Sequence, residues 1–379
     1  MDKNNAGELK ISLLVEGMDI EEKSKEGVGK DWQEKIYSYS LSDWTEKKLV
    51  LPSDIKVDNR VYIGVRYNPT SRWKLKKDNG FLKVENTNKE SISVELIPRP
   101  DYYDSRISDG KKLQEIGVAC GNHGFSFFIN SFCEYFMNDE NCRFCGLVPT
   151  QKKFSDTVKK KKLYQVSEVT AEILDSREKI DFIQLSGGSK YNHDVEVRNY
   201  ISFIKNINKQ LKKRGLEGMI PIHMTSMPPR NLNILNELKD AGLDTLSFDM
   251  ECPSEEYFKK YCPGKEKSYG YKNMRDSLKK AQEVFGEGNV YSIVLMGIEP
   301  RKEFIKSLEN IMADGVVPTL NVFHYDPFCS SNMDKEPHTE DIILTTKDVS
   351  KLFRKYNAFP GRLGCAHYDI GHEIKKGYF

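Results

Sequence analysis

The sequence has no excess of either charge, because 58 Lys and Arg residues stand against 56 Asp and Glu residues in 379. Nucleic-acid-binding domains usually carry a basic surface, so this balance argues against a nucleic-acid partner. No apolar run approaches the roughly 18 residues that indicate a membrane-spanning helix. The first residues, MDKNNAGELK, lack the apolar core of a signal peptide. We therefore expect a cytoplasmic protein with no membrane partner.

The sequence also lacks the paired cysteine clusters that are typical of structural zinc sites. Of its eight cysteines, only Cys142 and Cys145 form a Cys-x2-Cys pair, whereas zinc modules usually contain two such pairs. Cysteines of cytosolic proteins remain reduced, so eight of them need not form disulfides. Cys120, Cys252 and Cys262 are interpreted as small apolar core residues.

Residues 1–115 are predicted to form a small β-rich accessory domain. Alternating apolar and polar residues, typical of strands, recur in short segments: residues 11–15, 47–51, 60–67, 73–77, 80–85 and 91–97. Asp78, Asn79 and Gly80 separate two of these segments. Asn and Gly tolerate positive φ, so we expect a β-hairpin there.

Residues 116–330 alternate apolar runs with amphipathic stretches of helical length. The expected strands are residues 124–131, 180–188, 219–226, 245–251, 290–297 and 318–325. The expected helices are residues 167–178, 194–214, 229–240, 268–285, 301–313 and 346–356. This alternation indicates βα units and a parallel sheet. Six units are too few for a complete eight-unit barrel, so the predicted α/β fold is a partial (β/α)6 TIM-like barrel. Residues 331–379 are expected to be a C-terminal extension that closes or caps it.

Three cysteines, Cys133, Cys142 and Cys145, lie in the stretch NSFCEYFMNDENCRFCG that follows the first expected barrel strand. The carboxyl ends of parallel barrel strands are where active sites form. Three thiolates could bind zinc with a fourth ligand from elsewhere, for which Cys120 and His123 are candidates. Zinc is the weaker fit because there is only one Cys-x2-Cys pair, and the three thiolates could instead hold an iron–sulfur cluster, leaving one iron open for another molecule.

The cysteine loop resembles that of the radical S-adenosylmethionine (SAM) superfamily. In that family three cysteines bind a 4Fe–4S cluster, and SAM chelates the fourth iron. Most members have Cys-x3-Cys-x2-Cys, whereas this sequence has Cys-x8-Cys-x2-Cys, so five residues are inserted. Phe144 precedes the last cysteine, and the resemblance implies that it lies beside the adenine of SAM.

Three further stretches are similar to the family in the same order along the chain. LSGGS at 185–189 is similar to its Gly-Gly-Glu stretch and implies SAM contacts from Gly187, Gly188 and Ser189, with Ser189 replacing the acid. A simple glycine turn between strand and helix is the alternative. Residues 247–278 resemble biotin synthase and the [FeFe]-hydrogenase maturases, implying that Glu251 and Arg275 contact SAM. Residues 292–300 resemble the stretch that packs against adenine, which implies a role for Gly297.

The resemblance implies a reduced cluster that cleaves SAM to a 5′-deoxyadenosyl radical, which then abstracts hydrogen from a small-molecule substrate or adds to it. It also implies an electron donor such as flavodoxin or ferredoxin. Polar residues at the ends of two other strands are the candidate catalytic groups: His223, Thr225, Tyr325 and Asp326.

Two alternative functions stay open at this point. One is radical SAM modification of a peptide or protein, with the N-terminal domain as the recognition module. The other is a non-enzymatic zinc-binding or regulatory protein, in which the cysteine loop is structural. A second metal site could use Cys329, Cys365, His367 and His372, but no paired spacing supports it and a polar C-terminal tail is the preferred interpretation.

Overall fold

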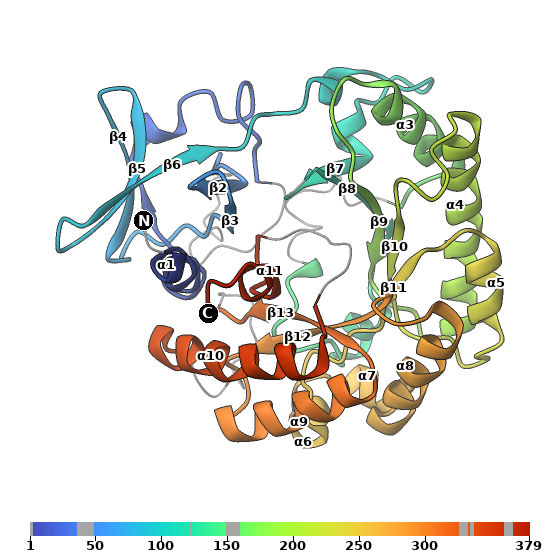
Figure 1. Cartoon of the computed structure of the whole chain (residues 1–379). Coiled ribbons are helices and arrows are strands. Elements are labelled where there is room, and N and C mark those ends of the chain that lie inside the picture. The colour runs from blue at the N-terminus through green and yellow to red at the C-terminus, as the bar shows by residue number, and fades with distance from the viewer. Residues whose placement is uncertain are drawn as a thin grey trace.

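The computed structural model describes residues 3–35, 49–121, 123–148, 160–325, 333, 337–359 and 367–379. Two sheets organise these residues, and they lie on opposite sides of the view in Figure 1. The smaller sheet is built from residues 19–96 and the larger from residues 117–322. Whether the segments 1–115 and 331–379 form separate domains stays a prediction.

The N-terminal sheet has six strands in the order β1-β4-β5-β6-β2-β3. Their bounds are β1 (Asp19–Ile20), β2 (Asp54–Val57), β3 (Val61–Gly64), β4 (Trp73–Asp78), β5 (Phe81–Asn86) and β6 (Ser91–Leu96). The predicted hairpin joins β4 to β5, where Asp78 pairs with Phe81. Asn79 and Gly80 have φ values of 47° and 86°, as a tight hairpin turn between twisted strands requires.

The prediction of a strand at residues 11–15 was wrong, because this segment is part of helix α1 (Lys3–Glu16). The helix packs against β3 and against α10 (Thr339–Tyr356). Ile11, Leu13 and Leu14 are completely buried, and even Lys10 has no exposed surface. A helix that is buried on all sides lacks the polar face that produces helical periodicity in a sequence, which is why the apolar run suggested a strand.

The larger sheet has seven strands that are neighbours in chain order, from β7 to β13. Their bounds are β7 (Gly117–Cys120), β8 (Gly124–Asn130), β9 (Phe182–Gly187), β10 (Ile222–Thr225), β11 (Thr245–Ser247), β12 (Val290–Met296) and β13 (Val317–Val322). Strands β8 to β13 are parallel, and β7 adds to β8 in the antiparallel direction. The sheet curls without closing (Figure 1). The predicted partial barrel of six βα strands is confirmed.

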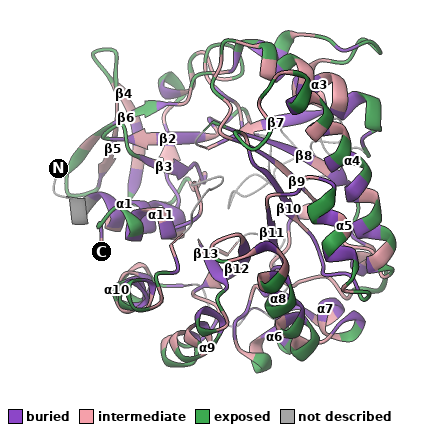
Figure 2. Ribbon diagram, turned by 45° about the vertical axis from the view of Figure 1, so that its right-hand side comes forward, coloured by how far each residue is buried: buried purple, intermediate pink, exposed green. Residues whose placement is uncertain are grey.

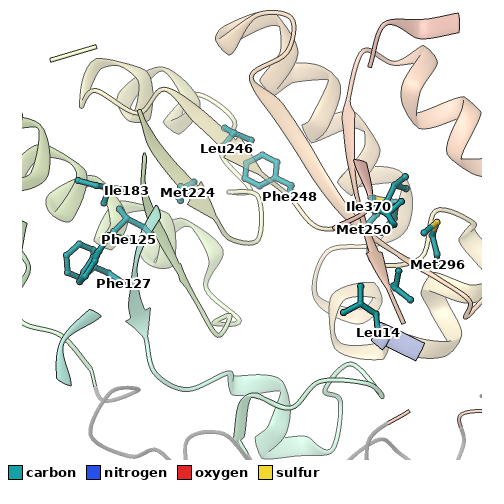
Figure 3. Packing of buried hydrophobic residues seen from close by; sticks show 14 of the residues in the cluster. Leu14, Phe125, Phe127, Ile183, Met224, Leu246, Phe248, Met250, Met296 and Ile370 are labelled. Atoms are coloured by element: carbon teal, nitrogen blue, oxygen red, sulfur yellow. The ribbon is translucent and has the colours of Figure 1, made fainter. Parts of the chain in front are cut away.

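Helices cover the outer face of the curled sheet: α3 (Leu163–Asp175), α4 (His193–Lys213), α5 (Ile234–Asp240), α6 (Glu255–Tyr261), α7 (Pro263–Ser268), α8 (Tyr271–Phe285) and α9 (Arg301–Ala313). Figure 2 shows that these helices carry exposed residues outward, whereas the strands behind them are buried. Phe125 and Phe127 of β8 pack edge to face with ring centroids 5.0 Å apart. Figure 3 shows these rings near Ile183 of β9, within the core between sheet and helices.

The C-terminal segment covers the β13 edge of the partial barrel. Asp369 forms an antiparallel bridge with Asn321, and its carboxylate accepts a hydrogen bond from the Leu320 amide at 2.8 Å. On the other side of the segment, the Gly64 amide of β3 donates to the His367 carbonyl at 3.1 Å. Residues 367–370 therefore lie between the two sheets and are hydrogen-bonded to both. The short helix α11 (Gly371–Lys375) follows.

Candidate active site

A cavity of about 330 Å³ lies at the carboxyl ends of the parallel strands. This is the end at which parallel barrels place their active sites. Most of the residues predicted from the sequence line it: Cys133, Cys142, Phe144, Cys145, Gly187, Gly188, Ser189, Thr225 and Glu251. These positions lie at the ends of four strands, β8 to β11, so the fold brings together residues spread over about a third of the chain.

Two glycines at the end of β9 let the cysteine loop pack directly against that strand. A Cβ atom on Gly188 would lie 2.5 Å from the backbone nitrogen of Cys133 and 2.5 Å from the carbonyl carbon of Phe132. A Cβ atom on Gly187 would lie 2.5 Å from the carbonyl oxygen of Asn130. Hydrogen bonds complete the contact: the Gly188 amide donates to Asn130 at 2.8 Å, and the Glu134 amide donates to the Ser189 carbonyl at 2.8 Å.

The residues inserted between Cys133 and Cys142 form a short 3-10 helix, η4 (Glu134–Asn138), that is fixed on two sides. Tyr135 is buried, and its hydroxyl contacts His193 of α4 at 3.1 Å and Ser268 of α7 at 2.7 Å. Glu140 accepts a hydrogen bond from the Tyr191 hydroxyl at 2.6 Å. The longer loop is therefore held by the elements on both sides of the cavity.

Cys133 is buried and Cys142 and Cys145 are half-buried, and the three thiols lie close enough to influence one another. Burial raises the pKa of the Cys133 thiol to about 11. A hydrogen bond with Cys262 and burial raise the pKa of Cys142 well above its usual value. Burial, with the nearby Cys142 and Cys133, raises the pKa of Cys145. Because three neighbouring thiolates would repel one another here, their ionisation needs a strongly positive group between them.

The arrangement of the side chains that could ligate a metal bears on whether the site would hold an iron–sulfur cluster or a single metal ion. Within the described residues, no group of three or more His, Cys, Asp or Glu side chains is placed to hold one metal ion. A single zinc ion would need all its ligands within about 2.0–2.3 Å, whereas each iron of a cluster takes a thiolate of its own. Three thiols from one loop on the wall of the cavity match the ligand set of a 4Fe–4S cluster that leaves one iron open.

A buried ion pair forms the side of the cavity that follows β11. The Lys265 ammonium lies 2.9 Å from the Glu251 carboxylate and donates to the Asp249 carbonyl at 2.7 Å. Burial disfavours the charged lysine, but the nearby acidic groups of Glu251, Cys142, Cys262 and Asp249 together outweigh it and raise the pKa of Lys265. Glu251 has a φ of 61°, a backbone strain that proteins retain mainly at functional positions.

Sequence reasoning missed Lys265, although its neighbours carried a signal. Pro263 begins α7, and a Cβ atom on Gly264 would lie 2.5 Å from the carbonyl oxygen of Glu140 in the cysteine loop. This Pro-Gly-Lys start of a helix, packed under the cysteine loop, directs the lysine into the cavity.

The structure places Arg275 and Gly297 away from the residues that line the cavity. Arg275 points from α8 towards the end of α9, where its guanidinium pairs with Asp314 and donates to the Asn310 carbonyl at 3.3 Å. Gly297 has a φ of 103° and forms the turn after β12, where a Cβ atom would meet Ile342 at 2.8 Å.

The structure places the candidate catalytic residues that it describes in different surroundings. Thr225 lines the cavity, whereas His223 lies deeper, with its ring 2.9 Å from the Thr245 hydroxyl and 3.4 Å from that of Thr225. Burial lowers the pKa of His223 to about 4, so the ring is neutral. Tyr325 lines a different hollow beside α1 and α10. Asp326 lies outside the described residues.

Of the proposed second metal site, Cys329 and Cys365 also lie outside the described residues. His367 forms an ion pair with Asp54 at 2.7 Å.

Three polar residues, Asn321, His324 and Tyr368, line the cavity beyond the end of β13. The His324 and Tyr368 rings lie 6.0 Å apart and are tilted by 32°. The Lys35 ammonium donates to the Tyr368 hydroxyl at 3.0 Å. A Cβ atom on Gly64 would lie 2.8 Å from the Tyr368 ring, so a glycine of the N-terminal sheet permits this tyrosine position.

Comparison with known proteins places this site in a family. Residues 138–311 match the model of the radical SAM superfamily. Bacteriochlorophyllide c C-7(1)-hydroxylase of Chlorobaculum limnaeum is 20% identical over 304 residues, which cover 77% of this chain and 75% of that protein. Among the described helices, none has the length and apolarity needed to span a membrane.

Solved structures with the same type of fold include methylornithine synthase, with a TM-score of 0.46, 14% identity and coverage of 63% of each chain. Another is the FeFe-hydrogenase maturase HydG of Carboxydothermus hydrogenoformans, with a TM-score of 0.47, 17% identity and coverage of 66% of this chain and 56% of that one. The chain spans less than two thirds of the length of either protein. The match to the family model includes Cys142, Cys145, the β9 glycines and the Glu251–Lys265 pair, so the chain contains a radical SAM domain, the type of domain that uses a 4Fe–4S cluster and S-adenosylmethionine.

Proposed function

We propose that Cys133, Cys142 and Cys145 hold the 4Fe–4S cluster and that the rest of the cavity binds SAM beside a small-molecule substrate. The observation that carries this proposal is that all three thiols, from one loop, line the same cavity as the β9 glycines and the Glu251–Lys265 pair. When bound, the cluster supplies one electron and SAM supplies a 5′-deoxyadenosyl radical. A one-electron donor such as flavodoxin or ferredoxin is required.

The ion pair is suited to the charged amino-acid end of SAM. Lys265 is the one Lys or Arg among the described residues that line the cavity, so its ammonium replaces Arg275 as the partner for a carboxylate. Glu251 provides an acceptor for an ammonium group. The backbone of Gly187 and Gly188, with Ser189, offers hydrogen-bonding groups on the opposite wall, and Phe144 offers an aromatic face for the adenine.

The end of the cavity formed by Thr225, Asn321, His324 and Tyr368 is the proposed substrate end. Its polar groups are hydroxyls, an amide and an imidazole, so it is suited to a substrate with neutral hydrogen-bonding groups. The curated relative acts, by its name, on bacteriochlorophyllide c, which is a small molecule. The N-terminal sheet supports this end through Gly64, which favours a small-molecule substrate over a peptide that would need an open groove.

The test is anaerobic reconstitution of the whole chain with iron and sulfide, followed by reduction with dithionite in the presence of SAM. We expect about four irons and four sulfides per chain and 5′-deoxyadenosine by mass spectrometry. Cys142→Ala should lose both, whereas Cys120→Ala, which removes a buried thiol outside the cavity, should retain both. Stoichiometric zinc without iron, or a full cluster in Cys142→Ala, would contradict the assignment.

A further inference from the structure

Asn321 of β13 presents an unpaired carboxamide to the cavity. The residue is half-buried and lines the cavity wall, and its side chain has no hydrogen-bond partner among the described residues. Other polar groups of this wall do have protein partners, since the Thr225 hydroxyl lies 3.4 Å from the His223 ring and the Asp249 carboxylate accepts from the Ile293 amide at 3.0 Å. The N–H donors and the carbonyl acceptor of Asn321 are therefore available to a bound molecule.

The backbone that carries this carboxamide is fixed on both edges of β13. On one edge, Asn321 lies opposite Leu295 of β12 in the parallel register. On the other edge, it forms a bridge with Asp369 of the C-terminal segment. The Leu320 amide donates to the Asp369 carboxylate at 2.8 Å, and the Ile370 amide donates to the Leu320 carbonyl at 2.9 Å. A group held in this way loses little freedom when it binds a ligand, which favours binding.

The wall around the carboxamide is largely apolar. Ile293 and Leu295 of β12 and Phe323 after β13 line the same cavity. A polar group in such surroundings is unfavourable unless it is hydrogen-bonded, so the carboxamide of Asn321 is best explained by a partner that arrives with a ligand. Asparagine offers an acceptor and a donor side by side on one planar group. The partner that satisfies both has a donor and an acceptor side by side as well.

We propose that Asn321 is a specificity-determining residue that binds an amide-like edge of the substrate, meaning an N–H group beside a carbonyl oxygen or a ring nitrogen. The inference rests on the proposed function, in which this end of the cavity holds the substrate. A ligand that lacks the N–H group leaves the Asn321 oxygen unpaired in an apolar wall. Sites of this kind discriminate against analogues that lack one hydrogen-bonding group. The adenine of SAM also has such an edge, so the affinity for SAM is measured alongside.

The test uses the full chain with its cluster reconstituted and oxidised and with SAM bound. The probes are 2-pyrrolidinone and cyclopentanone, two rings of the same size with the same carbonyl group, of which only pyrrolidinone has an N–H beside it. Ligand-detected NMR titration gives their dissociation constants in the wild type, Asn321→Leu, Asn321→Ala and Thr319→Val. Thr319→Val is the matched control, because Thr319 is also half-buried and lies two residues earlier on the same strand, but does not line the cavity.

We expect the wild type and Thr319→Val to bind pyrrolidinone roughly fivefold or more tightly than cyclopentanone, because one hydrogen bond is lost and one group is left unpaired in the ketone complex. In Asn321→Leu this preference should fall below about twofold, because leucine has nearly the same volume and no polar group. Asn321→Ala gives the same comparison if the leucine variant does not fold. Equilibrium dialysis should show the same affinity for SAM in all of these proteins.

The outcomes separate this inference from the proposed function. A wild type that has cluster and SAM but binds both probes equally, or binds neither at about 0.1 M, overturns the inference and leaves the function intact. A preference for pyrrolidinone that persists without the Asn321 carboxamide overturns it too. Loss of SAM affinity in the Asn321 variants would assign the carboxamide to adenine and not to the substrate. A wild-type chain that takes up no cluster overturns the proposed function itself.

Discussion

Replacing Gly188 with alanine tests whether the end of β9 holds the cysteine loop in place. The added Cβ atom would lie 2.5 Å from the Cys133 nitrogen, 2.5 Å from the Phe132 carbonyl carbon and 2.6 Å from its oxygen. All three are backbone atoms, so no side chain can rotate away. Gly188 has no positive φ, and the penalty is therefore purely steric.

The size of the effect follows from these distances. Carbon atoms pack at about 3.5–4.0 Å, so the loop that begins at Cys133 would have to move away from β9 by roughly 1 Å. Overpacking of this kind typically costs about 1–3 kcal/mol. The same movement shifts Cys133 relative to Cys142 and Cys145, which η4 and α7 hold from the other side. We therefore expect Gly188→Ala to lower the iron content more severely than it lowers stability.

The assay measures iron and sulfide after reconstitution, together with the free energy of unfolding of the cluster-free chain. Gly7→Ala is the control, because its Cβ would also meet a neighbour at 2.7 Å, but that neighbour is the side-chain ring of Phe379 and not a backbone atom. The control should keep full iron content. The reasoning is refuted if Gly188→Ala binds iron with wild-type stoichiometry and affinity.

Three further predictions concern the cavity walls. Lys265→Met should weaken SAM binding about tenfold or more, because hydrogen bonds to charged groups contribute about 1.5–3 kcal/mol. Arg275→Met, the control, should leave SAM binding unchanged. Equilibrium dialysis with labelled SAM measures both affinities, and equal losses in the two variants would contradict the assignment of Lys265. Tyr368→Phe should leave SAM binding intact and raise the KM of the substrate about threefold to tenfold, as steady-state kinetics would show. In the unfolded chain His223 is protonated below about pH 6.5, whereas burial lowers its pKa in the folded protein to about 4. As the pH is lowered from 6.5 to 4, the free energy of unfolding should therefore decrease, by up to about 1.4 kcal/mol per pH unit. The decrease should be smaller in His223→Gln, and identical slopes in the two proteins would refute the buried neutral ring.

The barrel could be predicted because its strands have a strong local signal. Strands β8 to β13 are buried on both faces and appear in the sequence as apolar runs, separated by helices with one apolar face. The helix predicted at residues 301–313 has those bounds in the structure. Helix α1 could not be predicted in the same way, because the partners that bury Ile11 and Leu14 come from the other end of the chain, including α10.

The site was predictable where its residues are contiguous and unpredictable where they depend on distant contacts. Cys133, Cys142 and Cys145 lie in one loop, so their spacing is visible in the sequence. Lys265 and Arg275 lie only ten positions apart along helical segments, and either could point inward. The packing of α7 against the cysteine loop, which no sequence pattern displays, selects Lys265.

The unusual spacing of the cysteines is resolved by the same packing. For the proposed cluster ligands, what matters is that the loop begins and ends at fixed places, and the number of residues between them is secondary. The loop begins where Gly188 meets Cys133, and it ends where the Arg143 amide donates to the carbonyl of Tyr261, the last residue of α6. The inserted residues turn outward as η4, and Tyr135 fills the space between α4 and α7 with its hydroxyl bonded to both. Shortening the loop would leave His193 and Ser268 without this partner, so in this chain the insertion is part of the structure that supports the cavity.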